Sequence, residues 1–153
     1  MDCYTTALTL LSRRELSTAQ LRTRLMRRTF DSSEIDDVIE RLAQERTLDD
    51  RRVAIAAARL EGAIRRRGRR RVLQRVQQLG IDATLAEAAV NEVFLEIDEG
   101  AMLEQAIDRK LGATNPPELD RKIAARLVRS LVAQGFELRD VCLRLRAKGV
   151  RGI

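Results

Sequence analysis

The sequence predicts an all-α fold in which three tandem three-helix repeats form an elongated, curved helical array. Three observations lead to this prediction. The chain has only 2 prolines and 8 glycines in 153 residues, too few for the many turns of a β-sandwich or barrel. Apolar residues recur at helical spacing along most of the chain, as in amphipathic helices that share a core. One pattern of apolar and acidic residues then returns after 51 and again after 55 residues, which indicates a repeat.

The repeat is anchored on three apolar residues, Phe30, Ile81 and Phe136. Five positions before each anchor stands another apolar residue, and the position after each anchor is acidic. Glycine directly precedes two of the anchors, at Gly80 and Gly135, where a helix would end in the left-handed conformation that glycine tolerates best. Each anchor therefore marks a tight turn between one helix and a second helix that begins at the acidic residue.

The first repeat is predicted to span residues 1–48. Its opening helix covers about residues 3–14, and the capping box Ser17–Gln20 then starts the second helix. The third helix begins with a similar box, Asp31–Glu34. The buried stripe of this third helix follows helical spacing through Ile35, Val38, Ile39 and Leu42.

The second repeat is predicted to span residues 49–97. Asp49 is expected to cap a helix over about residues 50–65, because aspartate accepts hydrogen bonds from the free amides at a helix start. A capping box at Thr84–Glu87 is expected to open the last helix of this repeat. The apolar face of the 50–65 helix is predicted to consist of Val53, Ala57, Leu60 and Ile64.

The third repeat is predicted to span residues 98–153. Its first helix covers about residues 99–111, ends at Gly112 and is followed by the loop "ATNPP". The core positions of this helix are Leu103, Ile107 and Leu111. Because units of this size bury only a modest fraction of their surface, we expect the three repeats to stack on one another as in a helical solenoid.

The composition restricts the possible functions. A net charge of +6 and a pI near 10.3 favour a polyanionic partner: nucleic acid, an acidic protein or an anionic membrane. The chain has no histidine, so catalysis by a histidine general base and metal binding by histidine are excluded. Cys3 and Cys142 lie far apart at apolar helical positions, where we expect buried free thiols. We predict no catalytic residue, cofactor or metal, and a cytoplasmic protein without a signal peptide or membrane span.

The stretch "AIRRRGRRRVL" at residues 63–73 is the strongest candidate binding site. Its like charges repel one another unless an anion arrives, and Gly68 in its centre disfavours a continuous helix. We therefore expect a bend from which arginines of two helices project toward one polyanion. The candidates are Arg65, Arg66, Arg67, Arg69, Arg70, Arg71 and Arg75. Weaker candidates, for which a structural role is the alternative, are Arg22, Arg24, Arg27, Arg28, Arg144 and Arg146.

Three stretches of the sequence resemble the RecX family of bacterial recombinase regulators. They are "ALTLLSRRELSTAQLRTRL" (7–25), "LDDRRVA" (48–54) and "GRRRVLQRVQQLGI" (68–81). They occur in the family's order and spacing, and with the third repeat the resemblance covers nearly the whole chain. The sequence departs from the family at Gln20, where glutamate is usual, at Val53, where an aromatic is usual, and at Arg75-Val76, where Glu-Leu is common.

The resemblance implies a regulatory protein that is not an enzyme. It implies binding to the RecA recombinase filament on single-stranded DNA and inhibition of filament extension, ATP hydrolysis and strand exchange. The polar ends of the terminal repeats separately favour a monomer. Arg71 matches an arginine of the family. Because the chain has few aromatics, binding to bare single-stranded DNA should be weak and non-specific. The alternatives are a non-specific nucleic-acid-binding module without a recombinase partner and, less favoured, a protein of anionic membrane surfaces.

Overall fold

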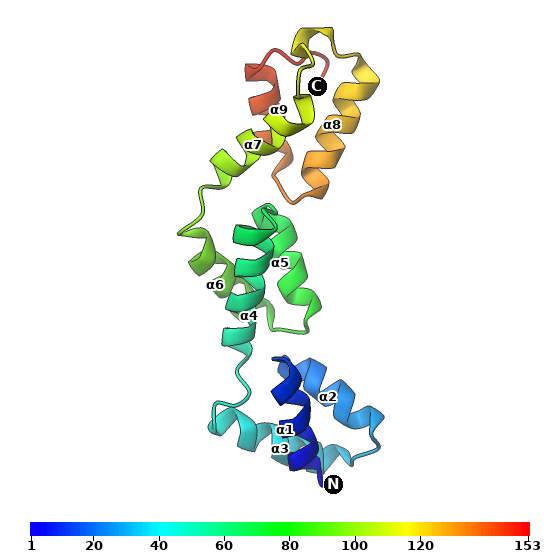
Figure 1. The fold of residues 1–153 in the computed structure, drawn as a ribbon, viewed down its shortest axis with the longest axis vertical. Helices are drawn as coiled ribbons and strands as arrows, with labels where there is room; N and C mark the ends of the chain where they lie inside the picture. The colour runs from blue at the N-terminus through cyan, green and yellow to red at the C-terminus, as the bar shows by residue number, and fades with distance from the viewer.

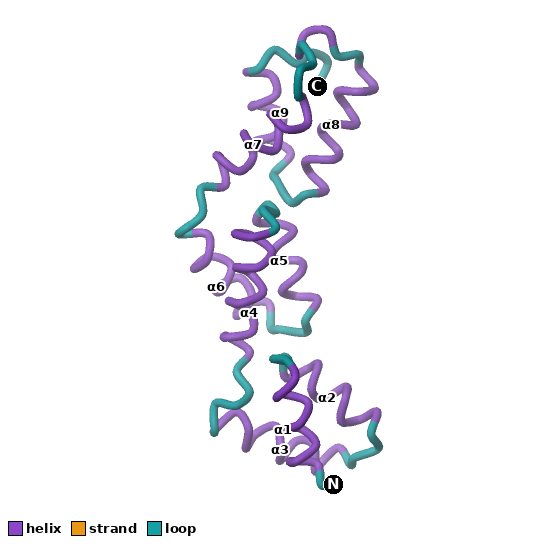
Figure 2. Tube along the Cα trace, in the orientation of Figure 1, coloured by secondary structure: helices purple, strands orange, loops and turns teal.

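The computed structural model describes residues 1–153 as an all-helical, elongated array. Three groups of three helices follow one another along the long axis, and the two chain termini lie at opposite ends (Figure 1). No strand occurs, and short loops join the helices (Figure 2). The predicted fold class, three tandem three-helix repeats in an elongated array, is therefore confirmed.

Each group consists of three consecutive α-helices. The first group consists of α1 (Cys3–Arg13), α2 (Thr18–Arg27) and α3 (Ser32–Gln44). The second consists of α4 (Asp50–Arg59), which continues into the π-helical turn η1 (Leu60–Ile64), and of α5 (Arg69–Gln78) and α6 (Ala83–Phe94). The third consists of α7 (Glu99–Leu111), the 3₁₀ turn η2 (Pro116–Glu118), α8 (Arg121–Ala133) and α9 (Leu138–Ala147).

The buried residues form three separate hydrophobic clusters, one for each group of helices. The first runs from Cys3 to Leu48, the second from Val53 to Val93 and the third from Met102 to Val150. Ile97 packs against both the second and the third cluster. Each group thus has a core of its own, while the division of the chain into units at residues 48 and 97 stays a prediction.

Most predicted helix ends are confirmed. Ser17 and Gln20 form the reciprocal capping box at the start of α2, and the Asp49 side chain accepts a hydrogen bond from the Arg52 amide. Gly80 and Gly135 have φ values of 81° and 108°, the left-handed region expected of glycines that end helices. The acids that follow the three anchors occupy N-cap positions: Asp31, Asp82 and Glu137.

Two predicted capping boxes are wrong. Asp31 caps α3 by position only, because its carboxylate accepts a hydrogen bond from the Ser33 hydroxyl instead of a backbone amide. Helix α6 begins before the predicted Thr84–Glu87 box, because Asp82 accepts hydrogen bonds from the amides of Thr84 and Leu85. At α3 the Ser33 hydroxyl donates to the Asp31 carboxylate, which then accepts no amide. At α6 the carboxylate of Asp82, two residues before the predicted cap, accepts hydrogen bonds from the free amides.

The predicted apolar face of the 50–65 helix is also wrong at its end. Leu60 and Ile64 are 41% and 72% exposed, whereas Glu61 and Gly62 are buried. The small residues Ala54 and Ala58 define the buried side against α6, and the π turn that follows inserts an extra residue, which changes the face that each later side chain occupies. A Cβ on Gly62 would lie 3.1 Å from Ile97 and 3.2 Å from Phe94.

The cysteines differ from one another. Both are free thiols, but only Cys3 is buried, and Cys142 is half-buried, contrary to the expectation of two buried thiols. Burial raises the pKa of the Cys3 thiol, with a smaller contribution from Glu34, so this thiol stays protonated near neutral pH.

The middle helices α2, α5 and α8 meet end to end, and both junctions use equivalent residues. At the first junction, the Ser17 hydroxyl donates to the Leu79 carbonyl at 2.5 Å, and the Thr18 amide donates to Asp50 Oδ1 at 2.7 Å. At the second junction, Gly68 has the place of Ser17, 51 residues later in the sequence. The Gly68 amide donates to the Gln134 carbonyl at 2.8 Å. Beside it, the Arg69 amide donates to Glu99 Oε2 at 2.8 Å.

Replacement of Ser17 by alanine is expected to destabilise the protein by about 1–2 kcal/mol, since it removes a helix cap and also the contact with the Leu79 carbonyl. The measurement is urea unfolding of the wild type and the variant. Ser12→Ala is the matched control, because Ser12 is exposed and bonds only a carbonyl of its own helix. Equal midpoints for the two variants would contradict the role assigned to Ser17.

Candidate polyanion-binding groove

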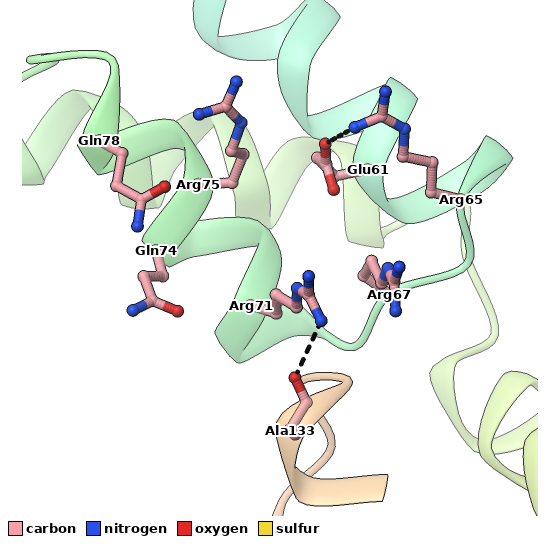
Figure 3. A pocket seen from close by; sticks show the side chains of 8 residues that line it. All are labelled: Glu61, Arg65, Arg67, Arg71, Gln74, Arg75, Gln78 and Ala133. Carbon is pink, nitrogen blue, oxygen red and sulfur yellow. Dashed lines mark hydrogen bonds and ion pairs between the residues drawn. The ribbon is translucent and has the colours of Figure 1, made fainter. Parts of the chain in front are cut away.

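The arginine-rich stretch surrounds the break between η1 and α5. Gly68 is the N-cap of α5 and has φ −68° and ψ 159°, an extended conformation that ends any continuous helix. Arg66 has a positive φ of 57°, which is unusual for a residue with a side chain. The predicted bend is therefore present, and side chains from η1, the connecting loop and α5 project from it (Figure 3).

Four of the seven predicted arginines share one groove. Arg65, Arg67, Arg71 and Arg75 line a hollow of about 460 Å³ between the end of η1 and the exposed side of α5. The sequence analysis did not include the other lining residues, which are Glu61, Gln74, Gln78 and Ala133. Gln74 and Gln78 stand three and seven positions after Arg71, so the helical spacing of α5 was a signal that could have identified them.

The positive charge in this groove is only partly compensated. Arg65 is paired with the nearly buried Glu61, with 2.6 Å between Nη1 and Oε1. Arg71 donates from Nη1 to the Ala133 carbonyl at 3.2 Å, a contact with a neutral group. Arg75 is exposed and forms no hydrogen bond or ion pair with the other residues drawn in Figure 3. The Nε atom of Arg67 is buried without a hydrogen-bond partner. The guanidinium groups of three groove arginines therefore have no carboxylate partner: Arg67, Arg71 and Arg75.

The other three arginines of the stretch do not line this groove but contact neighbouring helices, and Arg70 also lines an adjoining hollow of about 390 Å³ together with Arg71 and Gln74. Arg66 contacts Gln105 of α7, and Arg69 contacts Asn91 of α6. Arg70 lies 3.6 Å from the carboxylate of Glu137, at the start of α9. The predicted set of seven thus divides into four arginines that line the groove and three that contact other helices but do not line it. Arg71 does both, because it also donates to the Ala133 carbonyl of α8.

The Glu99 carboxylate accepts a hydrogen bond from the backbone amide of Arg69, the first residue of α5 after the break. Burial raises the pKa of this carboxyl, and the hydrogen bond from the Arg69 amide opposes that rise. On the opposite side of the connecting loop, a smaller hollow of about 250 Å³ includes Arg109, which the sequence analysis did not propose.

The weaker candidate arginines divide in a similar way. Arg22 forms an ion pair with Asp36 at 2.5 Å, while Arg24, Arg27 and Arg28 lie in or beside the last turn of α2. Two arginines near the C-terminus have partners within the third group. Arg144 pairs with Glu104 at 2.9 Å, and Arg146 donates to the Ile153 carbonyl at 2.6 and 2.9 Å.

The Arg144 ion pair gives a pH-dependent prediction. Hydrogen bonds from Arg144 and then from Lys148 hold the pKa of Glu104 below its usual value. A carboxyl whose pKa is lowered by folding stabilises the fold above its unfolded pKa, and this contribution disappears as the pH falls through the folded pKa. Glu104→Gln is expected to lower the free energy of unfolding at pH 7 by less than about 1 kcal/mol, because the pair is partly exposed. The thermal midpoint should fall accordingly.

The measurement is the thermal midpoint of wild type and Glu104→Gln from pH 7 down to pH 3. The difference between them is expected to shrink below about pH 4, where the unfolded carboxyl takes up a proton, and to close at the lower pH at which the folded carboxyl also does so. Glu118→Gln is the control, because Glu118 is exposed and lies outside the ion pairs of the third group. A difference that stays constant across this range would contradict the assigned cause.

Other kinds of site are not indicated. No group of three or more His, Cys, Asp or Glu side chains is placed to hold a metal ion. None of the helices combines the length and the apolar character that crossing a lipid bilayer requires. The groove at the η1–α5 break is therefore the feature with the clearest binding chemistry, which is that of an anion.

Comparison with known proteins identifies the family. A family model described as the first three-helix domain of RecX matches residues 3–42. The regulatory protein RecX of Trichlorobacter lovleyi is 29% identical over 138 residues, which are 88% of each chain. That of Halorhodospira halophila is 34% identical over 134 residues, which are 85% of this chain and 78% of the relative.

Solved structures agree in fold. The crystal structure of RecX from Lactobacillus salivarius superposes with a TM-score of 0.75 over 95% of both chains, at 18% identity. A second crystal structure of a regulatory protein RecX has a TM-score of 0.78 over 95% of this chain and 70% of the other. Since the sequence identity to named relatives reaches 34% over most of both chains, the protein belongs to the RecX family of regulatory proteins.

Proposed function

We propose that this protein regulates homologous recombination by binding the RecA recombinase filament on single-stranded DNA. Bound there as a monomer, it inhibits filament extension, ATP hydrolysis and strand exchange. Two facts support the proposal: the membership in a family of regulatory proteins, and the resemblance of the three sequence stretches to recombinase regulators. No catalytic group is needed, because a protein that occupies the filament acts by steric and electrostatic means.

The observation that carries the proposal is the position of the groove on the array. Arg67, Arg71 and Arg75 line the groove at the boundary between the second and third groups of helices, within the length of the elongated body and away from its two ends (Figure 1). An array that lies along a polymeric partner brings this uncompensated charge against a repeating anionic surface. The ends of the array then reach neighbouring subunits, which blocks the place where the next subunit would bind.

The test is the single-stranded-DNA-dependent ATPase of the cognate RecA, titrated with this protein at two salt concentrations. We expect the rate to fall at protein concentrations well below that of RecA, because one molecule at a filament end stops extension for many subunits. Higher salt should weaken the inhibition, since exposed charges are screened.

The alternative is a non-specific nucleic-acid-binding module. It predicts inhibition only when the protein covers the DNA. The protein concentration needed for inhibition should then rise with the concentration of nucleotides and not with the number of filament ends. Order-of-addition experiments separate the two: addition after filament assembly should still inhibit if the filament is the target. Loss of inhibition in that order would contradict the proposal.

A further inference from the structure

We propose that the arginine stretch is divided between two tasks. Arg67, Arg71 and Arg75 bind the phosphodiester backbone of single-stranded nucleic acid in the groove, whereas Arg66 and Arg70 hold the third group of helices against the second. The inference rests on the groove of the proposed function and adds the ligand and the residues that contact it. The sequence alone does not distinguish the arginines of this stretch, whereas the proposal assigns nucleic-acid binding to three of them.

The binding half of the proposal follows from charge that has no partner. Arg67 keeps a buried Nε atom without an acceptor, and buried donors are normally satisfied. Arg75 projects into the groove and forms no hydrogen bond or ion pair with its neighbours there (Figure 3). Arg71 offers one of its five donors to the neutral Ala133 carbonyl and leaves the others for a ligand. A phosphate oxygen supplies the charge-assisted bonds that all three lack.

The spacing of the donors favours a chain of phosphates over isolated acidic side chains. Arg71 and Arg75 are one turn apart on α5, about 6 Å along the axis, and Gln74 and Gln78 repeat on the same side. A strand whose phosphates recur at a fixed covalent interval meets successive donors on such a track. The carboxylate of Glu61 is already paired with Arg65 at 2.6 Å, so its charge does not oppose the ligand.

The lining also lacks a platform on which bases could stack. None of the eight residues that line the groove is aromatic, and single-strand platforms that hold bases rely on aromatic stacking. Amide and guanidinium donors reach phosphate oxygens in any sequence. We therefore expect binding that depends on salt and strand length and is indifferent to sequence.

The structural half follows from contacts across the boundary. Arg66 bonds Gln105 of α7 and Arg70 faces Glu137 at the start of α9, and both partners belong to the third group of helices. The Gly68 amide and the Arg70 amide donate to the carbonyls of Gln134 and Gly135 at 2.8 and 3.2 Å. The side chains of Arg66 and Arg70 therefore reinforce a junction that the backbone already makes.

The experiment compares two charge-matched double variants of the full chain. One is R71Q/R75Q in the groove, and the other is R66Q/R70Q at the junction. Binding of a fluorescein-labelled oligo-dT is measured by anisotropy over a series of salt concentrations. Each phosphate contact on a single strand contributes about 0.7 to the slope of log K against log salt. The groove variant should therefore lose about 1.4 from the slope, and roughly 25-fold in affinity at 0.1 M salt.

The junction variant should keep the wild-type slope and instead show a lower thermal midpoint. Equal losses of slope in both variants would overturn the division, and so would an unchanged slope in the groove variant. These results are separate from the test of the proposed function. If the wild type inhibits RecA but the groove variant still binds DNA normally, only this inference is refuted. If the groove binds oligo-dT but the protein has no effect on RecA, only the proposed function is refuted.

Discussion

Replacement of Gly68 by alanine is expected to separate the third group of helices from the second. A Cβ at this position would lie 2.5 Å from the Gly135 carbonyl oxygen and 2.6 Å from the Phe136 amide nitrogen. Gly68 has ordinary φ and ψ values, so alanine costs nothing in backbone strain and the effect comes from the contact alone. Because the obstructing atoms are backbone, no side-chain rotation relieves the overlap.

The expected cost is about 1–3 kcal/mol or more, the range for overpacking at a site that cannot adjust. Urea unfolding measures this cost. Small-angle scattering should detect a more extended molecule, and circular dichroism should show an unchanged helix content. Inhibition of RecA should fall as well, since the array no longer holds one shape. The control is Gly100→Ala in the first turn of α7, where the closest atom is the flexible end of Arg144 and alanine favours the helix. A Gly68 variant as stable and as compact as this control would contradict the role of the junction.

Replacement of Phe136 by alanine is expected to cost about 3–5 kcal/mol, the range for removal of a buried aromatic side chain. Phe136 is the largest fully buried residue of the chain, only 1% exposed, and it follows the Gly135 that meets Gly68. The loss therefore affects both the third core and the junction. Chemical unfolding with a probe in the third group of helices is the measurement.

Phe30 provides the matched comparison, because it is the equivalent anchor of the first repeat but only half-buried. Phe30→Ala should cost clearly less than Phe136→Ala, although the two residues have the same place in the sequence pattern. If the two variants lose the same stability, burial in the structure does not explain the difference between the repeats.

Much of the fold could be predicted because its signals are local. The helix over residues 99–111 and its end at Gly112 agree with α7, since an N-cap aspartate, apolar spacing and a glycine with φ 55° all act within a few residues. The stripe of Ile35, Val38, Ile39 and Leu42 is buried as predicted. The recurrence of the anchors revealed three repeats, because each repeat uses the same turn between its second and third helices.

Contacts between repeats could not be predicted in the same way. The approach of Gly68 to Gly135 joins positions 67 residues apart, and neither glycine differs in the sequence from one that only ends a helix. Likewise, Asp50 lies in the first turn of its own helix, but its carboxylate accepts hydrogen bonds from the amide and hydroxyl of Thr18. Such residues act through their partner, which only the three-dimensional arrangement reveals.

The candidate site was predicted as a region but not as a set of residues. Charge density identified the stretch from Arg65 to Arg71, and the π turn then decided which side chains face the groove. This turn buries Glu61 and exposes Ile64, opposite to the pattern expected of a regular helix. The pairing of Arg65 with Glu61 and of Arg70 with Glu137 removes two arginines from the available charge for reasons of geometry alone.

The central claim is that the RecA filament, and not bare DNA, is the target of this protein. The most direct test is the affinity of the fluorescently labelled protein for three partners at one salt concentration: RecA assembled on oligo-dT, the same oligo-dT alone, and RecA without DNA. We expect binding to the filament at least about tenfold tighter than to either component, a difference of about 1.4 kcal/mol. Equal affinity for the filament and for bare oligo-dT would contradict it and would leave a general nucleic-acid-binding protein.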